Sequence, residues 1–69
     1  MSDLEHLEHD IRKAILKNIR AVYKLMIIGE EMVIEAIKQR FLGENPKMVE
    51  QITRKTLDYW DIDKLIVDQ

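Results

Sequence analysis

The sequence lacks cysteine and contains little glycine, proline or aromatic residue. Its 69 residues include no Cys, 2 Gly, 1 Pro, 1 Trp, 2 Tyr and 1 Phe. Without cysteine the chain cannot form a disulfide, a zinc finger, an iron–sulfur site or a thiol nucleophile. Its two glycines stand alone at Gly29 and Gly43, so there is no glycine-rich loop of the kind that cradles phosphates.

Long apolar runs and a strong net charge are absent as well. The longest uncharged apolar run is Leu25–Ile28, which is far too short for a transmembrane helix. The net charge of −2 excludes a globally basic nucleic-acid binder but leaves room for a local basic patch. The first ten residues are acidic and carry no apolar signal-peptide core. We therefore expect a cytoplasmic protein with no membrane partner.

The composition is that of a small folded protein, with 46% apolar residues. We expect one domain over residues 1–69. A chain of this length buries only about 60% of its unfolded surface on folding. Small domains without disulfides or metals depend on oligomerisation or on very good helix packing.

The apolar residues of the first 28 positions recur at steps of three and four, which is helical periodicity and not strand alternation. The residues that follow this spacing are Leu4, Leu7, Ile11, Ile15, Ile19, Val22 and Met26. The pattern predicts one long helix over about residues 3–28. A glycine directly after an apolar run is typical of a helix end, so we expect a break or bend at Gly29.

Two shorter helices are predicted downstream. Apolar residues at helical spacing indicate a helix over about 31–42, which Gly43 ends. Asn45 is a strong N-cap and Pro46 is preferred at a first helical position, so the pair predicts a helix over about 46–60. Residues 61–69 fit a further helical turn, an extended tail or a short strand, of which the strand has no evident partner. The predicted fold is all-α, a chain of three helices.

The predicted first helix also suggests a homodimer. At about 1.5 Å per residue it would be nearly 40 Å long, and two shorter helices cannot cover all of it. A second chain related by two-fold symmetry is the commonest way to cover the rest, which favours a dimeric helical bundle. Tyr59 and Trp60, at the end of the last helix, read as a core plug or an interface anchor. The residues expected in the core or the interface are Ile19, Val22, Met26, Ile34, Ile37, Phe41, Ile52, Leu57 and Trp60.

Charge is strongly segregated along the chain. Between Ile11 and Gly29 there are five basic residues and no acidic one, and four of the five share one face of a continuous helix. This basic stripe consists of Lys13, Lys17, Arg20 and Lys24. It suits docking to phosphates, to an acidic partner or to an anionic membrane, although no Trp or Phe flanks it as a membrane site would favour. The alternative is a solvated face balanced by Glu30, Glu31 and Glu35 or by the acidic start of a partner chain.

The two later helices make a weak match to a helix–turn–helix motif. A turn at Gly43 joins them, but only two of four expected residue types fit. Basic residues on the last helix could still contact phosphates. The candidate anion or nucleic-acid contacts are Lys13, Lys17, Arg20, Lys24, Lys47, Arg54 and Lys55.

No residue set supports catalysis or metal binding. Ser2 is the only serine, and neither His6 nor His9 has a nucleophile as partner. The histidines and neighbouring carboxylates supply two ligands on one helical turn, which do not complete a site. We expect no enzyme, no metal and no cofactor. The leading hypothesis is a small interaction or assembly module, acting as a homodimer with an unidentified protein partner. The alternative is a small nucleic-acid-binding regulator that uses basic helix faces.

Overall fold

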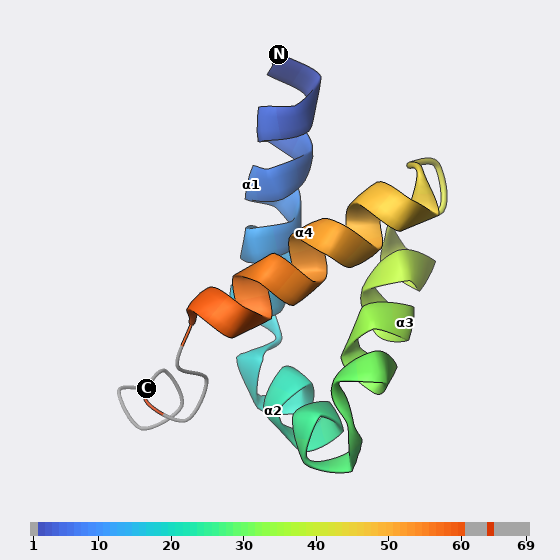
Figure 1. The fold of residues 1–69 in the computed structure, drawn as a ribbon. Coiled ribbons are helices and arrows are strands. Elements are labelled where there is room, and N and C mark those ends of the chain that lie inside the picture. The colour runs from blue at the N-terminus through green and yellow to red at the C-terminus, as the bar shows by residue number, and fades with distance from the viewer. Residues whose placement is uncertain (1, 61–63, 65–69) are drawn as a thin grey trace.

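The structure, a computed structural model, describes residues 2–60 and residue 64, and within them it contains four helices and no strand. The helices are α1 (Ser2–Lys17), α2 (Ile19–Ile28), α3 (Glu30–Arg40) and α4 (Pro46–Tyr59) (Figure 1). The all-α prediction is confirmed. The prediction of three helices is wrong, because the single helix expected over residues 3–28 is divided into α1 and α2. The alternatives for residues 61–69 fall outside the described residues, apart from residue 64.

The expected helix over 3–28 breaks at Asn18. The Asn18 side chain donates a hydrogen bond from Nδ2 to the Ala14 carbonyl at 3.0 Å, and its backbone N–H is shared between the carbonyls of Ala14 and Ile15. Asparagine competes with helical hydrogen bonding in this way, and its backbone here leaves the helical region at φ −118°, ψ 32°. The apolar periodicity runs through Asn18 without a gap, so it does not reveal the break.

Gly29 separates α2 from α3, as predicted. Its backbone lies at φ 158°, ψ 142°, a conformation that side-chain-bearing residues rarely adopt. Its N–H donates to the Leu25 carbonyl at the end of α2, and its own carbonyl accepts from Met32 N–H in the first turn of α3. One residue therefore ends one helix and begins the next.

The start of α4 is where the Asn-Pro pair predicts it. The Oδ1 atom of Asn45 accepts hydrogen bonds from the backbone N–H groups of Lys47 at 2.9 Å and Met48 at 3.4 Å. Pro46 occupies the first turn, where its missing N–H costs nothing. The helix bounds differ from the prediction by one or two residues: α3 ends at Arg40 and α4 at Tyr59.

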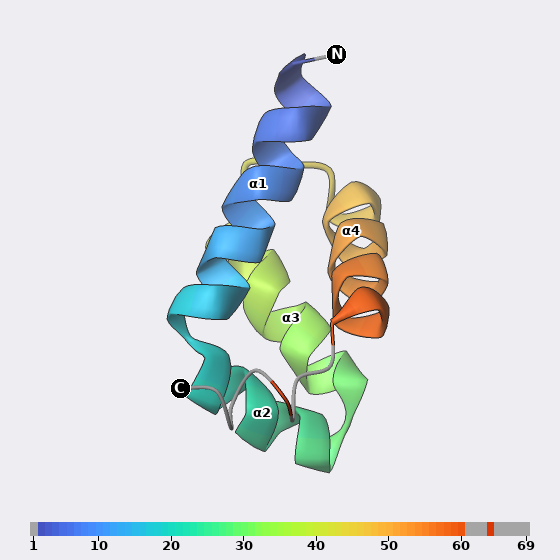
Figure 2. The ribbon, with the colours of Figure 1, turned by 90° about the vertical axis from the view of Figure 1, so that its left-hand side faces the viewer.

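The four helices enclose one apolar core. α4 packs against both α1 and α3, and α2 packs against α3 and α1 at the end of the molecule away from the N-terminus (Figure 1 and Figure 2). The buried apolar residues are Leu7, Ile11, Ile15, Ile19, Val22, Val33, Ile34, Ile37, Val49, Ile52 and Leu57. The hydroxyl of buried Thr53 donates to the Val49 carbonyl at 2.7 Å, so this polar group is satisfied within the core.

The break at Asn18 removes one argument for a dimer. A straight 26-residue helix would be longer than the helices that pack against it. Here the chain turns after Lys17, and α3 and α4 cover the apolar faces of α1 and α2. Ile11 and Ile15 on α1 are fully buried within a single chain, and Ile19 and Val22 on α2 nearly so. A second copy is not needed to cover this apolar face.

Candidate functional site

The break also divides the basic stripe. Lys13 and Lys17 lie on α1, whereas Arg20 and Lys24 lie on α2, and all four side chains are exposed. They therefore do not form the single continuous face that one straight helix would give. The remaining candidate contacts, Lys47, Arg54 and Lys55, lie on α4.

Arg54 is occupied by carboxylates. Its Nε lies 3.3 Å from Glu50 on the same helix, and its Nη1 lies 3.6 Å from Glu30 on α3. Its Nη2 donates to Glu31, also on α3. The hydrogen bond to Glu31 is the main reason that the pKa of Arg54 is raised above its ordinary value. Arg54 thus ties α4 to α3 and has little capacity left for a phosphate.

A second ion pair extends this network. The Lys38 Nζ lies 3.1 Å from Glu50 and 3.7 Å from Glu35. The hydrogen bond with Glu50 raises the pKa of Lys38, and the hydrogen bonds from Lys38 and then Arg54 lower the pKa of Glu50. The acids expected to balance the basic stripe (Glu30, Glu31 and Glu35) pair with these two cations instead. In the described part of the chain no ion pair forms with Lys13, Lys17, Arg20 or Lys24.

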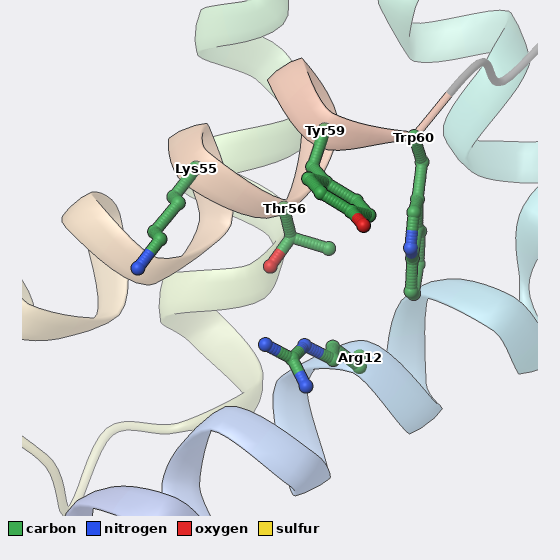
Figure 3. A pocket seen from close by; sticks show the side chains of 5 residues that line it. All are labelled: Arg12, Lys55, Thr56, Tyr59 and Trp60. Atoms are coloured by element: carbon green, nitrogen blue, oxygen red, sulfur yellow. The ribbon is translucent and has the colours of Figure 1, made fainter.

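A cationic and aromatic groove lies where the second half of α1 meets the end of α4. It consists of two adjoining hollows that share Arg12 and Trp60. One, of about 440 Å³, is lined by Arg12, Lys55, Thr56, Tyr59 and Trp60 (Figure 3). The other, of about 690 Å³, is lined by His9, Arg12, Lys13, Leu16, Lys17 and Trp60. We call the two hollows together the α1–α4 groove.

The two walls of the groove come from different helices. Lys55, Thr56 and Tyr59 of α4, and Trp60 at its C-terminal cap, extend toward α1, where Arg12 faces them (Figure 3). Trp60 packs partly against the apolar core, which holds its ring in place, whereas Tyr59 is 86% exposed. The groove therefore presents one anchored aromatic ring and one open ring beside each other.

The lining of the groove is positive. Its described residues include the cations Arg12, Lys13, Lys17 and Lys55, and none of these described lining residues is an Asp or a Glu. Arg12 is paired with Glu8, whose carboxylate lies 3.4 Å away, and the Arg12 side chain is still 52% exposed. An anion entering the groove would meet cations from both walls.

The groove brings together three of the seven predicted anion contacts, Lys13, Lys17 and Lys55. Sequence reasoning missed Arg12, because this residue lies off the stripe that a straight helix predicts. Its role depends on α4 lying alongside α1, a long-range contact with no local signal in the sequence. Arg20 lies with Lys17 and Asn18 at the break between α1 and α2, Lys24 is exposed on α2, and Lys47 is exposed in the first turn of α4.

An apolar patch lies at the junction of α2 and α3. Ile27 and Ile28 end α2 and are each 71% exposed, and Met32 in the first turn of α3 is 47% exposed. Isoleucine is one of the residues most often fully buried, so two adjacent exposed isoleucines are unusual. We call Ile27, Ile28 and Met32 the junction patch.

The residues predicted for the core or interface contribute to the core of one chain. Six of them are buried: Ile19, Val22, Ile34, Ile37, Ile52 and Leu57. The other three, Met26, Phe41 and Trp60, pack against the core and are partly buried. The junction patch, by contrast, contains no residue of that predicted set.

Comparisons with known proteins give no match to a protein-family model, a curated protein or a solved structure. In residues 2–60 and 64, no three His, Asp or Glu side chains come together as a possible metal site. Across the same residues, no helix combines the length and apolar character that crossing a membrane requires. Among the described residues, the groove and the junction patch are the surface features that bear most directly on function.

Proposed function

We propose that this chain is a small non-enzymatic interaction module that acts as a homodimer through the junction patch. The observation that carries the proposal is the exposure of Ile27 and Ile28, 71% each, beside Met32 on the next helix. Large apolar side chains that are exposed close together along the chain favour a surface at which soluble proteins bind partners. Burial against a second copy would remove these side chains from water.

Charge complementarity favours a second copy of the chain as the occupant. α2 exposes Arg20 and Lys24 and contains no acidic residue. α3 exposes Glu31 and Glu35, whose side chains are 73% and 67% exposed even with their ion pairs formed. In a two-fold interface each patch meets the same patch of the partner. The basic α2 of each copy can then face the acidic α3 of the other.

The expected affinity is modest. Burying three apolar side chains from each copy contributes on the order of 10 kcal/mol. Association costs about 4–15 kcal/mol in lost freedom, so the net gain is at most about 6 kcal/mol, which corresponds to a dissociation constant of roughly tens of micromolar. An interaction of this strength would be sensitive to protein concentration and, through its charged rim, to salt.

Sedimentation equilibrium tests the proposal. At about 400 µM protein in low salt, roughly ten times that dissociation constant, we expect a weight-average mass approaching twice the 8.2 kDa of the chain. The double variant Ile27→Gln with Ile28→Gln should be monomeric, and Gln keeps a good helix propensity at both positions. Leu42→Gln is the matched control, because Leu42 is 76% exposed but lies in the turn after α3. A monomeric wild-type chain, or equal loss of dimer in the control, would refute the proposal.

Two charge-reversal variants test the arrangement of the helices. Lys24→Glu places an acid on the outer face of α2, and Glu35→Lys places a base on that of α3. Each variant alone should dimerise more weakly than the wild type, because like charges then face each other. An equimolar mixture of the two should recover dimers, since each altered helix meets its complement. If the mixture is as weak as the separate variants, the basic and acidic faces do not meet.

A further inference from the structure

We propose that the α1–α4 groove binds single-stranded nucleic acid, with bases stacked on Trp60 and Tyr59 and phosphates held by the surrounding cations. This inference concerns a surface other than the junction patch and goes beyond dimer formation. Among the residues that the structure describes, the groove lining combines two neighbouring aromatic rings with four cations and includes no carboxylate.

The aromatic residues supply stacking surfaces of two kinds. Trp60 is anchored because part of its side chain packs on the core, so a base that stacks on it meets a fixed ring. Tyr59 stands beside it and is 86% exposed, and Figure 3 shows both side chains extending from α4 into the same hollow. Proteins that bind single strands use exposed rings of this type because every base has a π-face.

The cations are placed on both sides of these rings. Arg12, Lys13 and Lys17 line the α1 side, and Lys55 lines the α4 side. Lys13 and Lys17 lie one helical turn apart, about 5–6 Å along α1, so they can contact different oxygens of one backbone. Neither lysine is engaged by a carboxylate in the described part of the chain.

Single strands fit the groove better than a duplex does. Bases in a duplex stack on one another, and their faces are not available to a protein ring, whereas unpaired bases can be splayed onto aromatic side chains. Duplex recognition would instead require basic residues along one exposed helix, but on α4 Arg54 is held by Glu30, Glu31 and Glu50. An acidic protein segment would satisfy the cations but would leave the rings without stacked partners.

Trp60 is the only tryptophan in the chain, so its fluorescence reports directly on the groove. The probe is an oligothymidylate of about ten nucleotides, which has unpaired bases and no secondary structure. We expect quenching that saturates at tens of micromolar in low salt. If three or four phosphates are neutralised, the affinity should fall about 20–50-fold between roughly 50 and 200 mM salt.

Two sets of variants separate stacking from charge. Tyr59→Ala removes the open ring without disturbing the core and should weaken binding about tenfold. Lys13→Gln with Lys55→Gln removes two groove cations and should lower the slope of log affinity against log salt by about 1.4. Arg40→Gln with Lys47→Gln is the matched control, because it removes the same charge from exposed positions that line neither hollow.

Four results would overturn the proposal. The first is an absence of quenching and of binding up to about 100 µM oligonucleotide at low salt. The second is equal weakening by the control pair, which would indicate general electrostatic attraction. The third is equal affinity for a duplex of the same length. The fourth is equal quenching by polyglutamate, which would assign the groove to an acidic protein partner. The Ile27→Gln and Ile28→Gln chain should bind the oligonucleotide as the wild-type monomer does, so failure here and failure of the dimer are distinguishable.

Discussion

The Nζ atom of Lys38 on α3 lies 3.1 Å from a carboxylate oxygen of Glu50 on α4. The other Glu50 oxygen lies 3.3 Å from the Nε atom of Arg54. Glu50 is therefore the shared acid of a network that joins the two helices. The ion pairs are partly exposed, so each one alone contributes little to stability. Hydrogen bonds from Lys38 and Arg54 lower the pKa of Glu50, so this acid makes the α3–α4 contact sensitive to pH.

We expect the chain to lose stability in acid through Glu50. Hydrogen bonds from Lys38 and Arg54 lower the pKa of Glu50, so its contribution is present above the ordinary glutamate pKa of about 4.3 and is lost as pH falls through the folded-state value. Thermal unfolding at several pH values between 7 and 3 measures this. The fall in Tm should be smaller, by up to a few degrees, in Glu50→Gln than in the wild type. Glu44→Gln, at an exposed position in the turn, should behave as the wild type does.

Gly29 provides a test of backbone conformation that is independent of packing. A Cβ added there would meet no atom within 4 Å, yet φ of 158° is a value that L residues rarely adopt. Gly29→Ala should therefore destabilise the fold by about 1–3 kcal/mol, although no contact is lost. Denaturant unfolding measures the difference.

Gly43→Ala is the control for that experiment. Gly43 also has open space around the position of a Cβ, but its φ is not in the positive range. Its replacement should change the free energy of unfolding by less than about 1 kcal/mol, because only the entropy of the unfolded chain is affected. If both glycines tolerate alanine equally, the backbone at Gly29 relaxes at no cost and the sharp junction of α2 and α3 does not depend on glycine.

The features that the sequence predicted correctly are those with a local cause. Asn45 and Pro46 cap α4 through contacts with their neighbours in the sequence. Gly29, which follows an apolar run, ends α2 through its own backbone conformation. The break at Asn18 has a local agent too, but Ile15 and Ile19 keep perfect helical spacing across it. The spacing of the apolar residues indicates which side of a helix faces the core. It does not indicate whether the helix axis bends.

The candidate groove could not be predicted, because it follows from that bend. Arg12 and Trp60 meet only because the chain turns at Asn18 and again at Gly29, and α4 returns alongside α1. The same turn separated Arg20 and Lys24 from the lysines of α1. A helical wheel drawn for one straight helix therefore places the four cations of the basic stripe on one face. Only two of them, Lys13 and Lys17, line the groove.

The N-cap at Asn45 should be worth a measurable part of the total stability. Its side chain satisfies two backbone N–H groups at the start of α4, those of Lys47 and Met48. Asn45→Ala should cost about 0.5–2 kcal/mol. In a domain of this size that corresponds to a loss of roughly 4–8 °C in Tm for each kcal/mol. Asn45→Asp keeps the acceptor oxygen and should retain wild-type stability, and an equal loss in both variants would show that the cap is not what stabilises α4.

Leu57 and Leu42 differ sharply in their burial. Leu57 on α4 is 4% exposed and belongs to the core, whereas Leu42 in the turn after α3 is 76% exposed. Leu57→Ala should cost about 2–5 kcal/mol, because it removes buried methyl groups and leaves a cavity. A domain of 69 residues has only about 3–10 kcal/mol of stability in total, so this variant should be close to unfolding at room temperature. Leu42→Ala should lie within about 0.5 kcal/mol of the wild type. Equal behaviour of the two variants in urea titrations followed by circular dichroism would mean that α4 does not pack as described.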